Sequence, residues 1–251
     1  MKIQLIRNAS LKIWINNKVI LVDPMLGDKF SIPSFGGKSK NPLVDLPLAI
    51  EEILEGLDAV LITHLHQDHW DEKAWEIIPK DTTIFCQPGD LEKIKAQGFH
   101  TIISIDGSLN FEGLNITRTK AQHGSGKILE LMGEASGYIL AANGEPTIYI
   151  VGDSILIPEI TSYIDQHNPD VILTNSGGAI MPGYEKTPIL MDATQTADLA
   201  DYCSPKLLVT CHLEALDHCK VSREELNLLG SVKESRNIFV PFDGDVMDFG
   251  V

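Results

Sequence analysis

The most informative part of the sequence is Ala59-Val60-Leu61-Ile62-Thr63-His64-Leu65-His66-Gln67-Asp68-His69. Residues 59–62 are apolar, few and partly β-branched, which predicts a short buried strand. Three of the eight histidines follow it, all within the six residues 64–69. Because side chains alternate along a strand, His64 and His66 project to the same side, and a turn can bring Asp68 and His69 beside them. The segment therefore predicts four ligand side chains around one small volume.

Imidazole and carboxylate groups together suit zinc, manganese or iron, and a catalytic zinc ion keeps one coordination position open for water. The alternative is a run of capping and surface histidines. Three further candidates follow the predicted strands 114–120, 147–151 and 207–211, namely His123, Asp153 and His212. Each alone is explained more simply as a cap or a turn residue. Together with the first cluster they indicate additional metal ligands.

The hydrophobic pattern predicts alternating strands and helices over most of the chain. Strands are expected at 2–7, 10–15, 19–22, 59–62, 82–86, 101–105, 114–120, 137–142, 147–151, 171–174 and 207–211. Helices are expected at 48–57, 71–78, 89–97, 158–167 and 193–202. Asn16-Asn17 marks a hairpin turn, and residues 24–47 form a long surface loop that can overhang a site. We therefore expect an α/β protein in which two sheets pack face to face with helices outside, as a single domain over residues 1–251.

Composition limits the classes of partner. The chain has 251 residues, of which 43% are hydrophobic, and its formal charge is −15. This charge repels nucleic acid but does not exclude an anionic small substrate, because bound divalent cations reverse the potential locally. The N-terminus has no leader pattern, and no apolar run approaches the roughly 20 residues of a membrane-spanning helix. We expect a cytoplasmic enzyme whose partner is a small molecule and whose four cysteines are reduced. The sequence carries no readable indication of oligomeric state.

The ligand candidates resemble the signature of the metallo-β-lactamase superfamily, HxHxDH followed by a distant His, an Asp and a His. All seven positions are filled, and the resemblance implies the αββα sandwich fold with a dinuclear metal site at one edge. It assigns His64, His66 and His123 to one ion and Asp68, His69 and His212 to the other, with Asp153 bridging them. The segments 21–24 and 151–154 resemble most the branch that contains ascorbate-6-phosphate lactonase and uncharacterised metal-dependent hydrolases.

The resemblance implies a hydrolase that holds two divalent ions, zinc or manganese, with iron as an alternative. A bridging hydroxide attacks the carbon of a carbonyl group or the phosphorus of a phosphoryl group, and Asp68 also shuttles a proton. A cytoplasmic lactone or a phosphoester is the expected substrate. A phosphodiesterase of the same fold and a non-catalytic metal-binding module are the alternatives. A diiron oxidoreductase of this fold is expected to carry Glu where His66 stands.

Several residues are weaker candidates for supporting roles. Asp23 is the first choice to orient a ligand imidazole, and a turn residue before Pro24 is the competing interpretation. Residues 175–178, with Asn175, can present an amide and backbone N–H groups to a substrate, although such turns are common. His218 can line the pocket. Cys211 adjoins a ligand candidate, but the strand alternation predicts that its side chain points into the core.

Overall fold

The computed structural model describes residues 1–204, 206–233 and 236–250, and within these two sheets of seven strands are formed. The first sheet has the order β14 (Val246–Asp248), β1 (Lys2–Arg7), β2 (Ser10–Ile15), β3 (Lys18–Val22), β4 (Ala59–Leu61), β5 (Thr83–Cys86) and β6 (Ile102–Ser104). The second has the order β13 (Ile238–Phe239), β12 (Leu207–Cys211), β11 (Val171–Asn175), β10 (Ile148–Ile150), β9 (Ser136–Ala142), β8 (Leu114–Lys120) and β7 (Ser108–Phe111).

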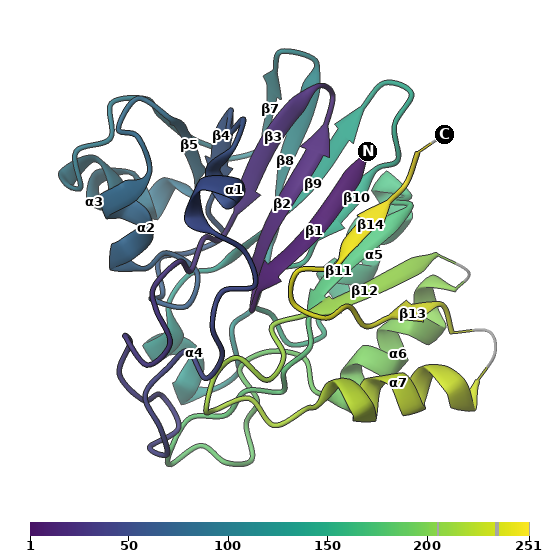
Figure 1. Ribbon diagram of the computed structural model, residues 1–251. Coiled ribbons are helices and arrows are strands. Elements are labelled where there is room, and N and C mark those ends of the chain that lie inside the picture. Colours follow the sequence, from purple (N-terminus) through teal and green to yellow (C-terminus); the bar gives the residue numbers. More distant parts are fainter. Residues whose placement is uncertain (205, 234–235, 251) are drawn as a thin grey trace.

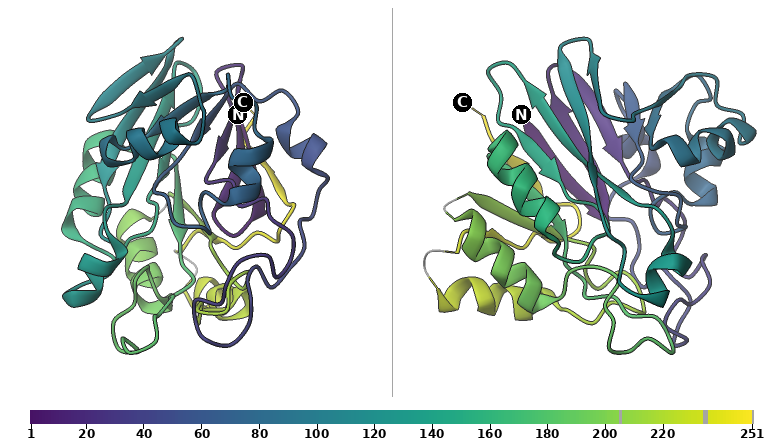
Figure 2. Two further views of the ribbon diagram at one scale, coloured as in Figure 1. Left: turned by 90° about the vertical axis from the view of Figure 1, so that its left-hand side faces the viewer. Right: turned by 180° about the vertical axis from the view of Figure 1, so that it is seen from behind.

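Alternation along the strands creates the layers. In β4, Ala59 and Leu61 join the core between the sheets, whereas Val60 points outward to the helices. On that outer face lie α1 (Ile50–Leu54), α2 (Glu72–Ile77) and α3 (Leu91–Ala96). The outer face of the second sheet is covered by α5 (Pro158–His167) and α6 (Ala193–Cys203), with α7 (Arg223–Val232) beside β13. Figure 2 shows helices on both outer sides, so the expected αββα sandwich is confirmed.

The strand directions gather the ligand candidates at one edge. Strands β3 to β6 are parallel, as are β10 to β13, and β8 runs in the same direction as β10 because β9 is antiparallel to both. Parallel strands present their carboxyl ends at one edge of a sheet, which is the usual position of a site in such folds. The connections that follow these ends lie below the sheets in Figure 1, together with α4 (Lys127–Met132).

Most predicted elements are found, with ends shifted by a few residues. The Asn16-Asn17 hairpin is present, and both residues have positive φ, 52° and 56°, which asparagine tolerates. Of the helix predicted at 48–57, only the residues of α1 are helical. The helix predicted at 89–97 is a 3-10 turn (Pro88–Asp90) followed by α3. Five elements were missed: β7, α4, α7, β13 and β14. Within the described ranges, none of the helices has the length and apolar content needed to cross a membrane.

The segment 24–47 contains no helix or strand, as expected, but it is more buried than a surface loop. Met25 and Leu26 are fully buried. The guanidinium of Arg7, also fully buried, donates hydrogen bonds to the carbonyl oxygens of Met25, Gly27 and Val44. These bonds anchor the segment against β1 because they satisfy both a buried charge and buried carbonyl groups.

Candidate metal centre

Three histidines form the first group of converging ligand atoms. His64 and His66 follow β4, and His123 follows β8. Nδ1 of His66 lies 2.9 Å from Nε2 of His64 and 3.3 Å from Nε2 of His123. His64 and His123 are buried, whereas His66 is half-buried. The strand end and the turn thus bring together residues that are 57 positions apart in the sequence.

A second group lies beside the first and contains two carboxylates and two imidazoles, all buried: Asp68, His69, Asp153 and His212. Oδ2 of Asp68 is 3.1 Å from Nε2 of His212 and 3.7 Å from Nε2 of His69. Within this group the ligand atoms all lie within 4.8 Å of one another. All seven residues singled out in the sequence therefore fall into two adjacent clusters.

Asp153 connects the two groups. Its Oδ2 lies 3.3 Å from Nε2 of His69, 3.5 Å from Nε2 of His123 and 3.8 Å from Nε2 of His212. Its Oδ1 accepts a hydrogen bond from Nδ2 of Asn175, at the end of β11. One carboxylate oxygen therefore faces members of both groups while the other is held by an amide.

Four of the imidazoles direct Nε2 toward the clusters and are held at Nδ1 by another group. The Nδ1 atoms of His64, His69, His123 and His212 are held, in that order, by Thr63 Oγ1 at 3.1 Å, Asp23 Oδ2 at 2.8 Å, the Ile189 carbonyl oxygen at 2.7 Å and Cys219 Sγ at 3.5 Å. Such outer contacts fix the ring orientation and the tautomer of ligand histidines.

Asp23 has several contacts of this kind. Its Oδ1 accepts a hydrogen bond from the Thr63 backbone N–H, and its Oδ2 accepts one from the Thr63 hydroxyl, each at 2.7 Å. The residue also has positive φ, 45°. Asp23 thus has a turn conformation and also contacts the imidazole of His69, so the two interpretations drawn from the sequence do not exclude each other.

Asn175 and its neighbours lie beside the clusters rather than in the pocket described below. The backbone N–H groups of Ser176 and Gly178 donate to the carbonyl oxygens of Cys211 and Met191, so they are not available to a substrate. Cys211 points into the core, as the strand alternation predicts. The thiol that contacts His212 belongs instead to Cys219, which sequence reasoning missed because it follows His212 by seven residues with no motif between them.

Charge balance sets the protonation of the second group. Burial lowers the pKa of His69, but the carboxylates of Asp153, Asp23 and Asp68 outweigh it and raise this pKa to about 10. Burial also lowers the pKa of His212, but the Asp153 carboxylate outweighs burial and raises this pKa well above its usual value. The cluster of carboxylates therefore draws positive charge to this position.

The first group has the opposite character. Burial lowers the pKa of His64 well below its usual value, and the neighbouring imidazoles of His69 and His66 lower it further. Burial is also the main cause of the lowered pKa of His123. Neutral imidazoles are the form that binds metal ions.

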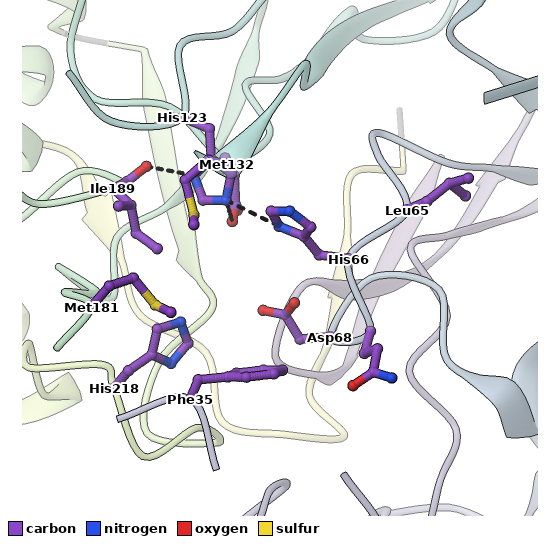
Figure 3. A pocket seen from close by; sticks show the side chains of 11 residues that line it. Phe35, Leu65, His66, Asp68, His123, Met132, Met181, Ile189 and His218 are labelled. Atoms are coloured by element: carbon purple, nitrogen blue, oxygen red, sulfur yellow. Dashed lines mark hydrogen bonds and ion pairs between the residues drawn. The ribbon is translucent and has the colours of Figure 1, made fainter. Parts of the chain in front are cut away.

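A cavity of about 250 Å³ opens beside the clusters. It is lined by Phe35, Leu65, His66, Gln67, Asp68, His123, Met132, Asp153, Met181, Ile189 and His218. Figure 3 shows His66 and Asp68 on one side of the cavity, with Met181 and His218 across from them and Phe35 beside His218. The apolar members come from three separate loops and α4, and no local pattern in the sequence indicated them.

His218 is an uncharged pocket side chain at neutral pH. Burial, together with the nearby His212, lowers its pKa to about 4 against the opposing effect of Asp68. Its Nδ1 is buried and makes no hydrogen bond among the described residues. The ring meets that of Phe35 edge to face, with centroids 5.2 Å apart. The imidazole is therefore held in place while one nitrogen stays unpaired.

Comparisons with known proteins match this geometry. The family model described as "Beta-lactamase superfamily domain" matches residues 18–213. UPF0173 protein YddR of Bacillus subtilis is 35% identical over 99% of this chain and 100% of its own length. A possible metal-dependent hydrolase of Veillonella parvula superposes with a TM-score of 0.94 at 32% identity, covering 98% of both chains. An isothiocyanate hydrolase from Delia radicum gut bacteria superposes with a TM-score of 0.91 at 34% identity, covering 100% of both.

These similarities concern the superfamily and its metal-dependent hydrolases. The narrower resemblance to the ascorbate-6-phosphate lactonase branch stays a prediction. The pocket lining described above contains neither lysine nor arginine.

Proposed function

Because this chain belongs to the β-lactamase superfamily and is a metal-dependent hydrolase of its UPF0173 family, we propose that it binds two divalent ions and hydrolyses a small neutral substrate. Zinc or manganese is the proposed metal, with iron as the alternative, because histidine and carboxylate ligands accept all three. The observation that carries the proposal is the convergence of the seven ligand candidates in two adjacent groups, four members of which line an otherwise largely apolar cavity.

The spacing of the ligand atoms supports metal binding. Zinc lies about 2.0–2.1 Å from nitrogen and oxygen ligands, so two ligands of a tetrahedral ion are separated by about 3.4 Å. The nitrogen and oxygen contacts given above within the two groups range from 2.9 Å to 3.8 Å. Nε2 of His69 is buried and has no hydrogen-bond partner among the described residues, so a cation can take the place of the proton that the surrounding carboxylates hold on this ring.

The two groups divide the proposed ligands. His64, His66 and His123 hold the first ion, and Asp68, His69 and His212 hold the second. Asp153 would contribute to both ion positions, because its Oδ2 faces His123 of one group and both His69 and His212 of the other. Asn175 keeps that carboxylate in position through its other oxygen.

The side chains of the pocket supply the remaining chemistry. Bound ions of this kind lower the pKa of a coordinated water from about 15.7 toward roughly 7 and stabilise the negative charge that develops on the substrate. Asp68 lines the cavity and is proposed to take the proton of the attacking water and to deliver it to the leaving atom. His218 is proposed to orient the substrate through a hydrogen bond from its neutral ring.

The lining favours a neutral substrate with an apolar group. Phe35, Leu65, Met132, Met181 and Ile189 form the apolar walls. Phosphate recognition usually adds arginine or lysine, and the described lining has neither, which argues against the phosphodiesterase alternative. An isothiocyanate, R–N=C=S, fits these walls, and the similarity to an isothiocyanate hydrolase supports this substrate class. The hydroxyl group of water adds to the carbon of its C=N bond and the proton goes to nitrogen, and cleavage of the C–N bond of the resulting thiocarbamic acid then releases the amine R–NH₂ and carbonyl sulfide. A neutral lactone is the second candidate, since the same lining accepts it.

The experiment is a comparison of three substrates of similar size on protein loaded with zinc or manganese. The three substrates are benzyl isothiocyanate, a chromogenic lactone and a phosphodiester. Their hydrolysis is followed side by side, with and without a chelator, and that of the isothiocyanate is read as a loss of absorbance. We expect metal-dependent turnover of the isothiocyanate. Turnover of the lactone alone would transfer the assignment to the second candidate. Turnover of the phosphodiester alone, or of none of the three, would contradict the proposal.

Asp23 offers a separate test of the metal site. Replacing Asp23 by Ala or Asn is expected to weaken zinc binding about 10- to 100-fold, because His69 loses the carboxylate that orients its ring. Affinity is measured by competition with a chromogenic chelator.

The Asn variant separates the two contacts of Asp23. Asparagine tolerates the positive φ of this position but carries no negative charge for the imidazole. Asp81, an exposed carboxylate that pairs with the exposed His100, provides the matched control as Asp81→Asn. Unchanged affinity in Asp23→Asn would assign Asp23 to the turn alone.

A further inference from the structure

The carboxylate of Asp217 is a hydrogen-bonding centre outside the metal clusters. Six donors from the loop 34–41 point at its two oxygens, namely Ser34 Oγ, the backbone N–H groups of Phe35, Gly36, Lys38 and Ser39, and Asn41 Nδ2. The backbone donors lie 2.9 to 3.2 Å away. In return, Oδ1 of Asn41 accepts a hydrogen bond from the backbone N–H of Asp217 at 2.8 Å.

These donors saturate the carboxylate. An ionised carboxylate offers about four lone-pair positions, so six donors leave none for a substrate or an ion. Burial raises the pKa of Asp217, but the Ser34 hydroxyl and the backbone N–H groups outweigh it and hold this pKa well below its usual range. Asp217 is thus a charged structural centre and not a ligand.

The two segments that Asp217 joins each carry a pocket side chain. Phe35 lies in the loop, His218 directly follows Asp217, and their rings are in edge-to-face contact in the cavity wall of Figure 3. The segments also approach closely, since a Cβ at Gly36 would lie 2.8 Å from the Asp217 carbonyl oxygen. The position of this wall therefore depends on the hydrogen bonds of one carboxylate.

We propose that Asp217 is a positioning residue that selects substrates by the size of their apolar group. It holds loop 34–41 against the segment of His218, so that Phe35 and His218 form a fixed wall at a set distance from Asp68 and His66. The selection rests on the proposed hydrolysis of neutral substrates. The fixed wall is a property of the protein that is measured without turnover.

The first test is Asp217→Asn, in which an NH₂ group replaces one acceptor oxygen and faces other donors. Hydrogen exchange at the amides of Phe35, Gly36, Lys38 and Ser39 is expected to accelerate at least about tenfold, because their shared acceptor is weakened. Metal content is expected to stay at the wild-type value, since the six donors to the Asp217 carboxylate all belong to the loop 34–41 and none of them is a ligand candidate.

Kinetics with two isothiocyanates test the selection itself. Benzyl isothiocyanate reaches the wall, whereas methyl isothiocyanate is too short to need it. In Asp217→Asn the KM for the benzyl compound is expected to rise about tenfold while kcat changes little, and the methyl compound is expected to be nearly unaffected. A variant that only destabilised the protein would change both substrates equally.

Two further variants complete the design. Gly36→Ala places a Cβ against the Asp217 carbonyl oxygen and is expected to give the same selective rise in KM, which keeps the test available if Asp217→Asn folds poorly. Asp201→Asn is the control, because Asp201 lies on α6 and is paired with Arg236 and Lys233.

The outcomes distinguish the two proposals. Unchanged amide exchange in Asp217→Asn, or faster exchange with an unchanged ratio of kcat/KM for the two isothiocyanates, would overturn the role of Asp217. If the wild-type protein hydrolyses neither compound, the isothiocyanate assignment fails, and accelerated exchange then still supports the fixed wall.

Discussion

Replacing His66 by alanine is expected to abolish turnover, lowering kcat/KM by at least about 1,000-fold. Its Nδ1 is the atom that lies nearest both other imidazoles of the first group, at 2.9 Å and 3.3 Å. Without it, His64 and His123 retain too few ligands to hold an ion firmly. The fold is expected to persist, because His66 is half-buried and belongs to no hydrophobic core.

Metal content and rate are measured together on protein purified without a histidine tag. Plasma mass spectrometry is expected to find about two ions per wild-type chain and about one in the variant. His100→Ala serves as the matched control, because His100 is an exposed histidine whose ring pairs with the exposed Asp81. A His66→Ala protein with full activity would remove the mechanism, and a wild-type protein that takes up no metal would remove the central inference.

Replacing Asp153 by alanine is the second large effect that we expect. Its Oδ2 faces three imidazoles, so the loss disturbs both proposed ion positions at once. Activity is expected to fall as far as in His66→Ala, and metal content to fall below one ion per chain. Removing one partner of a buried charged pair typically costs about 3–5 kcal/mol, so the metal-free variant is also expected to be less stable in urea.

The Asn variant of this position isolates the charge from the shape. Asp153→Asn keeps the volume beside Asn175 but lacks the bridging negative charge, and it is expected to lose metal nearly as completely. Asp170→Asn is the control, since Asp170 is an exposed carboxylate that accepts a bond from the Thr147 backbone N–H. Two ions retained in Asp153→Asn would show that Asp153 does not bridge.

Local chemistry explains why the strands and the ligand candidates are readable in the sequence. The alternation in 59–62 places Val60 and Leu61 on opposite faces whatever the rest of the chain does. The spacing of His64 and His66 by two residues predicted that they converge, and they do so in the turn that follows β4, with ring nitrogens 2.9 Å apart. Edge strands such as β13 and β14 have only two and three residues, and they exist because a partner strand is present, so no local pattern indicates them.

The sequence by itself determined most strands and helices, the sandwich class and the ligand candidates at 64–69, because these depend on side-chain spacing within a few residues. His123, Asp153 and His212 were singled out by their positions after predicted strands and by the resemblance to the superfamily signature. Only the tertiary structure decided the pocket walls, the thiol of Cys219 beside His212 and the hydrogen bonds of Asp217. Ser34 and Asp217 are 183 positions apart, and Asn8 and Asp68 are 60 apart, yet each pair is hydrogen-bonded. Contacts of this kind arise from the packing of whole sheets and loops, which bring together groups whose sequence positions carry no common period.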